Sequence, residues 1–294
     1  MTETSIPKDG LVIVDKPSDW TSHDVVGRMR RLAGTRKVGH AGTLDPMATG
    51  VLVLGINRAT RLLGHLTLAD KEYVATIRLG QSTVTDDAEG DVTSTTSAAH
   101  VDEAAARSVL AEFTGDIEQV PSSVSAIKVD GVRSYARVRS GEEVTLKARP
   151  VRVAELELTG FRPGEVADVD IRVVCSSGTY IRALARDIGT TLGVGGHLTA
   201  LRRTRVGGFT LDEAHTLDEL GNELTVIGID DVARASFPSC ELSDDQAADV
   251  HFGRALPGLD LGSDGPVAVF APTGDFLALY EQRGPDAKPV AVFV

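Results

Sequence analysis

The sequence predicts an α/β (α+β) chain with a mixed, largely antiparallel sheet and a small β-rich region at its C-terminal end. Short apolar runs alternate irregularly with segments of helical periodicity, which argues against a doubly wound sheet. The 294 residues are 42% hydrophobic and 24% charged, which suffices for a sizeable core. From about Asp231 the chain changes to short apolar runs separated by Gly, Pro and Asp, a pattern typical of a small β module.

The N-terminal half begins with a strand, a helix and a second strand. Thr21 or Ser22 can cap a helix whose apolar residues recur at helical spacing, and Gly34 suits its left-handed end. Apolar and polar residues alternate over 73–79, which predicts a half-buried strand. Residues 82–100 are polar and are predicted to form a loop. Further strands are expected at residues 11–14 and 51–56.

Further helices and strands are expected between residue 100 and the start of the β-rich region. Asp102 can cap a helix that runs to Phe113, residues 169–175 alternate as a strand, and a helix is expected over 181–192. We therefore expect a large domain over residues 1–230 and a small module over 231–294. The strands expected in that module are 267–270, 277–280 and 290–294.

Composition excludes several classes of protein. No apolar run approaches the roughly 20 residues of a membrane helix, and the first residues do not resemble a leader peptide. Cys175 and Cys240 are far apart, so neither a disulfide framework nor a CxxC metal site is expected. These features predict a cytoplasmic chain without a membrane partner.

The net charge of −12 is unevenly distributed along the chain. From Gly207 onward there are 4 basic and 16 acidic residues, whereas residues 1–206 contain 26 of each sign. Basic residues of this neutral part occur in three groups, and local potential rather than net charge governs attraction to phosphate. Each group alone is more simply a solvated face, but together they favour an anionic partner. The groups are Arg28, Arg30, Arg31, Arg36 and Lys37; Arg133, Arg137, Arg139, Lys147, Arg149 and Arg152; and Arg202, Arg203 and Arg205.

The most unusual segment is GHAGTLDP, residues 39–46. Its two glycines permit backbone angles that other residues avoid, and Pro46 biases Asp45 toward an extended conformation. An Asp in a stiff loop between a basic helix and a buried strand suits a nucleophile or general base. The simpler interpretation is a tight turn in which Asp45 bonds its own backbone.

Other ionisable residues are weaker candidates. His40 has no partner at metal-ligand spacing, so no metal site is expected. Tyr180 and Arg182 fall in the first turn of a predicted helix, which suits an anion, although a surface Arg is the default interpretation. The sequence contains no phosphate loop, no GxGxxG turn and no GxSxG elbow, so no nucleotide cofactor is expected.

Taken together, these segments resemble the TruB-type tRNA pseudouridine synthases of bacteria. The similarity extends in order to about residue 220, with Asp19 replacing the Gly more usual in the turn after Lys-Pro, and Arg61 where some members have Lys. The segments that carry it are Asp15-Lys16-Pro17, Thr21-Ser22, GHAGTLDPMATG (39–50), Ala59-Thr60-Arg61, Asp70-Lys71-Glu72-Tyr73, PSSVSAIKVDGVRSY (121–135), Ser177-Gly178-Thr179-Tyr180-Ile181-Arg182, Asp187-Ile188-Gly189 and Leu201-Arg202-Arg203-Thr204.

The resemblance implies a pseudouridine-synthase catalytic fold followed by a PUA-like module. It implies that uridine 55 in the TΨC loop of tRNA is flipped out and isomerised to pseudouridine without a cofactor. In this interpretation Asp45 is the catalytic nucleophile, Tyr73 stacks on the base and Arg182 pairs with Asp45. His40 would fill the space left by displaced loop bases, and Tyr180 and Leu201 would line the uracil pocket. Lys16 and Arg61, within matching segments, are further candidates for substrate binding.

Two alternatives remain open. A non-catalytic RNA-binding or tRNA-folding protein on the same scaffold would keep the basic groups but would not need Asp45, Tyr73 and Arg182 together. A guide-dependent rRNA pseudouridine synthase usually has a complete C-terminal RNA-binding module, whereas this C-terminal region is short and acidic. We expect an enzyme that acts on tRNA as a monomer, without an obligate protein partner.

Overall fold

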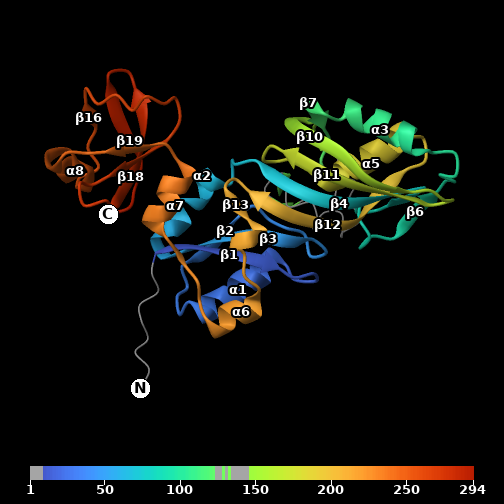
Figure 1. Ribbon diagram of the computed structural model, residues 1–294, viewed down its shortest axis with the longest axis horizontal. Helices are drawn as coiled ribbons and strands as arrows, with labels where there is room; N and C mark the ends of the chain where they lie inside the picture. Colours follow the sequence, from blue (N-terminus) through green and yellow to red (C-terminus); the bar gives the residue numbers. More distant parts are fainter. Residues whose placement is uncertain (1–8, 123–127, 130–131, 134–145) are drawn as a thin grey trace.

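The computed structural model describes residues 9–122, 128–129, 132–133 and 146–294. The predicted α/β class is confirmed, because a ten-stranded mixed sheet forms the larger part and a five-stranded sheet the C-terminal part. Figure 1 shows the two parts next to each other, with helices α2 (Leu63–Leu66) and α7 (Ile229–Ser236) between them. Two residues of the second basic group, Arg137 and Arg139, and most of segment 121–135 lie outside the described residues.

The large sheet has the order β14-β1-β3-β12-β4-β11-β10-β7, with β2 paired to β3 and β13 to β12. Every pairing in it is antiparallel except that of β3 with β12, which confirms the prediction of a mixed, largely antiparallel sheet. The strands are β1 (Gly10–Lys16), β2 (Val38–Ala41), β3 (Thr49–Ile56), β4 (Lys71–Leu79), β7 (Gly115–Gln119), β10 (Arg149–Arg162), β11 (Ala167–Cys175), β12 (Gly196–Val206), β13 (Phe209–Thr210) and β14 (Ile227–Gly228).

The main helices begin where the sequence places their caps. Thr21 and Asp24 form a capping box at the start of α1 (Ser22–Leu32), and Asp102 caps α3 (Glu103–Glu112). Helices α3 and α5 (Ile181–Thr191) pack on one face of the large sheet, where their apolar side chains join those of β4, β11 and β12 in one core. The shorter helical elements are η1 (Asn57–Arg61), η2 (Leu211–Glu213) and α6 (Leu217–Asn222).

One predicted loop contains regular structure. Residues 82–100 include strand β6 (Val92–Thr95), which pairs with β5 (Gln81–Thr83). All four residues of β6 are exposed, so its sequence lacks the apolar alternation by which a strand is recognised. A second short pair is formed by β8 (Lys128–Val129) and β9 (Val132–Arg133).

The C-terminal part is β-rich, as predicted. Its sheet has the order β15-β17-β18-β19-β16, and one face packs on helix α8 (Asp244–His251). The other face contributes Phe270, Phe276 and Phe293 to a core that contains residues of β1 and β3. The boundary expected after residue 230 lies within α7. The strands are β15 (Ser239–Glu241), β16 (Leu256–Pro257), β17 (Val267–Phe270), β18 (Phe276–Arg283) and β19 (Asp286–Val292).

None of the helices in the described part of the chain has the length and apolar character needed to cross a lipid bilayer.

Candidate active site

Asp45 lies in the turn that joins β2 to β3. Gly42 and Gly50 have φ angles of +79° and +97°, a region that favours glycine. A Cβ atom at Gly50 would lie 2.1 Å from the backbone oxygen of Arg203, so this loop passes directly against β12. Within the turn, Ala48 donates to the carbonyl oxygen of Asp45 at 3.1 Å.

Two neighbouring segments hold this turn on either side of Asp45. The Ser22 hydroxyl accepts from the amide of Leu44 at 2.9 Å and donates to its carbonyl oxygen at 3.0 Å. The Lys16 ammonium donates to the carbonyl oxygen of Pro46 at 3.0 Å, and burial lowers the pKa of Lys16 to about 8. The backbone amide of Asp19 donates to the same Pro46 oxygen. The backbone of the turn is therefore bonded directly before and directly after the carboxylate.

The turn after Lys16-Pro17 explains the departure at Asp19. Asp19 has a φ angle of +66°, which glycine adopts readily and which Asp tolerates better than most residues. Asp19 thus occupies a position whose backbone angle also suits Gly.

Arg182 forms an ion pair with Asp45 from the start of α5. Its Nε atom lies 3.0 Å from Oδ2 of Asp45, and its side chain is 6% exposed whereas that of Asp45 is 37% exposed. The other end of the guanidinium donates to the carbonyl oxygen of Thr85 at 2.9 Å and lies 3.3 Å from Oδ2 of the buried Asp87. Because Arg182 is bonded on both sides, it can fix the direction as well as the charge of Asp45.

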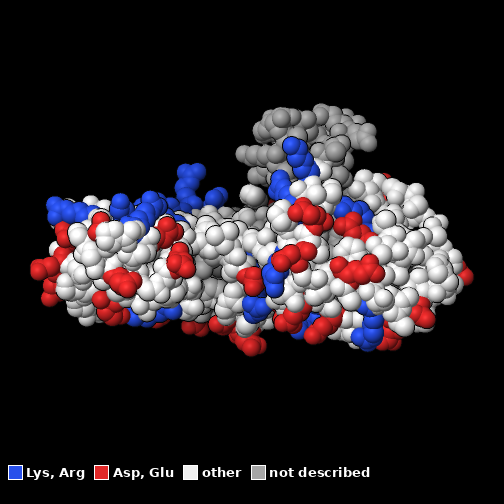
Figure 2. All heavy atoms as spheres, turned by 90° about the horizontal axis from the view of Figure 1, so that it is seen from above, with Lys and Arg blue, Asp and Glu red and all other residues white. Residues whose placement is uncertain are grey.

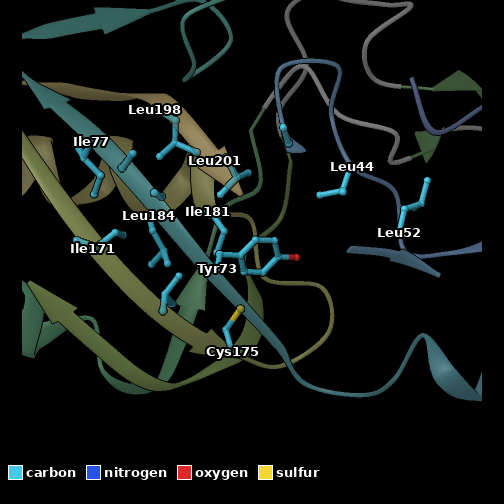
Figure 3. Close-up of a cluster of buried hydrophobic side chains, with 14 of the residues drawn as sticks. Leu44, Leu52, Tyr73, Ile77, Ile171, Cys175, Ile181, Leu184, Leu198 and Leu201 are labelled. Carbon is cyan, nitrogen blue, oxygen red and sulfur yellow. The ribbon is translucent and has the colours of Figure 1, made fainter. Parts of the chain in front are cut away.

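Asp45 and Arg182 border a cavity of about 270 Å³, which Tyr73, Tyr180 and Leu201 also line. Tyr73 is buried on β4, and burial raises its pKa. Figure 3 shows its ring projecting from the apolar cluster between β4 and α5 toward the side of Leu44. A carboxylate beside a cavity lined by aromatic side chains can serve as a nucleophile or general base toward a planar ring.

Tyr180 is held through its backbone. The buried side chain of Gln119 donates from Nε2 to the Tyr180 carbonyl oxygen at 3.1 Å and accepts from the Tyr180 amide at 2.8 Å. These two hydrogen bonds give partners to the backbone amide and carbonyl group of the residue that precedes α5, where no side chain caps the helix. Gln119 thus links strand β7 to the cavity wall.

The cavity brings together five of the eight predicted site residues: Asp45, Tyr73, Tyr180, Arg182 and Leu201. Lys16 lies buried behind the loop. His40 lies on β2 with its ring 5.7 Å from that of His23, and burial lowers its pKa. Arg61 lies at the end of η1 and donates to the carbonyl oxygen of Val292 in β19. Roles for Lys16, His40 and Arg61 in substrate binding remain predictions.

Three buried charged residues around the cavity were not among the candidates. Lys71 and Arg203 line it, and Asp87 pairs with Arg182 behind it. Burial and the nearby Arg203 lower the pKa of Lys71 to about 8. Strand alternation could have indicated Arg203, because it shares a strand face with Leu201. Asp87 lies in the polar segment predicted as a loop, where no pattern distinguishes it. Within the described ranges, no three His, Cys, Asp or Glu side chains group as a metal site would require.

Comparison with known proteins gives high similarity along the whole chain. The sequence is 63% identical to tRNA pseudouridine synthase B of Arthrobacter sp. (strain FB24), over 97% of this chain and 96% of the relative. It is 60% identical to the protein of that name from Thermobifida fusca (strain YX), over 97% and 98%. Among solved structures, a chain of a Cbf5-Nop10-Gar1 complex is 29% identical with a TM-score of 0.76, covering 98% of this chain and 86% of that one.

Family models match three consecutive segments. Residues 30–181 match the N-terminal domain of the TruB family pseudouridylate synthases, and residues 182–231 match a tRNA pseudouridylate synthase B C-terminal domain. Residues 237–294 match the C-terminal domain of tRNA pseudouridine synthase II. The family and the catalytic fold implied by the sequence segments are thereby confirmed, and the chain belongs to the TruB family of pseudouridylate synthases.

Proposed function

We propose that this chain is a tRNA pseudouridine synthase that isomerises uridine 55 in the TΨC loop. The reaction breaks the N1–C1′ glycosidic bond, turns the base and joins C5 to C1′, while a proton leaves C5 and another is added to N1. The observation that carries the proposal is the 3.0 Å ion pair between Arg182 and Asp45 at the edge of a cavity lined by Tyr73, Tyr180 and Leu201. The names of the relatives support tRNA as the substrate.

In this proposal each cavity residue has a distinct task. Asp45 is the nucleophile, Arg182 aims it, and Tyr73 stacks on the flipped base. Flipping costs about a few kcal/mol, which stacking and phosphate contacts offset. Among the described residues, Arg28, Arg31, Arg36 and Lys37 of the first basic group have no carboxylate at ion-pair distance, so their charge is available to phosphate. Figure 2 also shows Lys and Arg gathered along one edge of the molecule.

We further propose that the chain acts in the cytoplasm as a monomer, with residues 1–230 as the catalytic domain and 231–294 as a PUA-like module. Light scattering coupled to gel filtration tests the oligomeric state. A mass near the 31.0 kDa of one chain supports the monomer, and a multiple of it contradicts it.

The guide-dependent alternative has one observation in its favour. A chain of a solved H/ACA RNP bound to a substrate RNA is 28% identical with a TM-score of 0.72, covering 97% of this chain and 85% of that one. Identities of 60% and above to tRNA pseudouridine synthase B proteins outweigh it.

One assay separates these functions. The purified protein is incubated with an unmodified tRNA transcript, without guide RNA, and pseudouridine is mapped by position. We expect pseudouridine at position 55 only, and none in a matched transcript with cytidine there. If pseudouridine formation depends on an added guide RNA, the result supports a guide-dependent synthase. If the protein binds the tRNA but forms no pseudouridine, the result supports a non-catalytic RNA-binding protein.

A further inference from the structure

Arg203 is a fully buried cation in the wall of the cavity. Its Nε atom donates to the carbonyl oxygen of Val51 at 2.7 Å, and Nη2 donates to that of Gly42 at 3.1 Å. No described Asp or Glu lies within ion-pair distance of its guanidinium. Because burying a charge is costly, retention of an arginine here indicates a task beyond packing.

Tyr73 is the side chain placed to use the remaining donors of Arg203. The two residues are direct cross-strand partners in the antiparallel pair β4 and β12, so their side chains share one face of the sheet. Both line the cavity. A guanidinium has five N–H donors, and the two carbonyl oxygens use two of them. Donors thus remain for the phenol oxygen of Tyr73.

The second contact of Arg203 reaches the catalytic loop. Gly42, whose carbonyl oxygen it binds, lies three residues before Asp45, and a Cβ atom at Gly42 would lie 3.5 Å from Nη1 of Arg203. Val51, the other acceptor, lies in the strand that follows the loop. One rigid side chain therefore contacts the loop's entry and its exit.

We propose that Arg203 is a positioning residue of the reaction proposed above, which ties the Asp45 loop to β3 and holds the Tyr73 phenol against the cavity. The planar guanidinium group of Arg203 suits this task because its N–H donors point in fixed directions, whereas a lysine offers a single charge on a flexible side chain. Tyr73 and Asp45 thereby keep a constant relative position while the base enters between them.

The electrostatics of Tyr73 supply a readout that packing alone would not change. Burial raises its pKa, while the nearby charge of Arg203 lowers it. Cys175 on β11 and Asp45 in the loop also raise its pKa, and the cations Lys71 and Arg182 line the same cavity. Arg203 is the cation directly opposite Tyr73 in the sheet, and its removal should make the phenol less acidic.

The experiment places 3,5-difluorotyrosine at position 73 of the full chain, because the more acidic phenol titrates while the protein remains folded. Its pKa is followed by ¹⁹F NMR in the parent protein and in Arg203→Met. The matched control is Arg202→Met, the neighbouring residue on the opposite face of β12. We expect Arg203→Met to raise the phenol pKa by about 1 unit or more and Arg202→Met to leave it unchanged.

An unchanged pKa in folded Arg203→Met would overturn the proposal. If that variant does not fold, Arg203→Lys is used instead, and the single-turnover rate is measured in two proteins, one that retains Tyr73 and one that carries Tyr73→Phe. We expect Arg203→Lys to lower the rate about tenfold when Tyr73 is present and to lower it little further when Tyr73→Phe is present. Equal losses in both would contradict the proposal. The NMR titration requires no activity, so it fails or succeeds independently of the proposed function, which the mapping assay tests.

Discussion

On the outer face of the large sheet arginines pair with carboxylates of neighbouring strands, whereas on the cavity face the buried cations mostly bond to backbone carbonyl oxygens. Outside, Arg78 on β4 lies 2.9 Å from Asp168 on β11. Arg172 on β11 lies 2.9 Å from Glu72 and 3.2 Å from Glu157, on the strands at either side. These cross-strand pairs neutralise one another on a solvated surface.

On the cavity face the donors are used differently. Lys71, in the cavity wall, binds the carbonyl oxygens of Thr67 and Ala69, and Lys16, buried behind the Asp45 loop, binds those of Pro17 and Pro46. Carbonyl oxygens satisfy the donors but carry no net charge, so the positive potential remains directed at the cavity. Arg182 is the exception, since it pairs with Asp45 and Asp87.

Burial and the type of partner, more than the number of arginines, therefore distinguish charges that stabilise the fold from charges placed to act on a substrate. Exposed ion pairs contribute about 0–1 kcal/mol each. A buried cation that has no carboxylate partner lowers the stability of the fold, because its desolvation is not compensated by an opposite charge. Its presence therefore indicates an electrostatic role toward a bound substrate. Substitutions on the cavity face should therefore change catalysis, and those on the outer face should change stability slightly.

The largest effect is expected for Asp45→Asn, which should abolish pseudouridine formation and leave tRNA binding intact. The amide keeps the size of the side chain but is not a nucleophile. The matched control is Asp168→Asn, on the outer face. For both variants, the single-turnover rate of pseudouridine formation and the affinity for tRNA are measured separately. Near wild-type turnover by Asp45→Asn would refute its assignment.

Arg182→Lys should come next, with a loss on the order of 100-fold in single-turnover rate and little change in affinity. Lysine keeps the charge but cannot bond Asp45, Asp87 and the Thr85 carbonyl oxygen in fixed directions. Arg78→Lys is the matched outer-face variant. A rate within about twofold of wild type for Arg182→Lys would show that Arg182 is not needed to fix the orientation of the Asp45 carboxylate.

Substitutions in the basic segment at and after the end of α1 test the proposed contact of this surface with tRNA phosphates. Replacing Arg30, Arg31 and Arg36 by Ala should weaken tRNA binding at low salt. Each of these arginines that binds a phosphate should contribute roughly 0.7–0.9 to the slope of log K against log salt, so the slope should become shallower. Fluorescence anisotropy over a salt series measures it, and an unchanged slope would mean that this surface does not meet RNA.

The smallest effect is expected on the outer face. Arg172→Met should lower the free energy of unfolding by about 1 kcal/mol or less and leave the single-turnover rate unchanged. Urea denaturation followed by circular dichroism measures the first quantity. A clear loss of rate in a fully folded variant would remove the distinction between the two faces.

Local patterns predicted most of the elements and indicated the stiff loop that carries Asp45. Caps at Thr21 and Asp102 and the alternation over 73–79 identified helices and a strand, because these signals depend on adjacent residues. The stiff loop around Asp45 was recognisable for the same reason. The resemblance to a family, rather than any local signal, distinguished Arg182 from an ordinary surface arginine.

The remaining features depend on contacts between distant parts of the chain. Asp87 meets Arg182 only because the β5–β6 region folds beside α5, and nothing in its own segment indicates this. Lys16 and Arg61 occur in matching segments, yet the fold places one behind the loop and the other against Val292. A local motif shows that a residue matters, but only the tertiary structure shows what it touches.

Arg202 and Arg203 are consecutive on β12 and point to opposite faces of the large sheet, so matched substitutions at these two positions separate the roles of the two faces. Arg202 binds both carboxylate oxygens of Asp15, at 3.0 and 2.7 Å, and Arg203 binds the Val51 and Gly42 carbonyl oxygens. Each is replaced by lysine, and the single-turnover rate of pseudouridine formation is measured with saturating enzyme. We predict a loss of about tenfold or more for Arg203→Lys and a rate within about twofold of wild type for Arg202→Lys. Equal losses, or a larger loss at Arg202, would contradict the account.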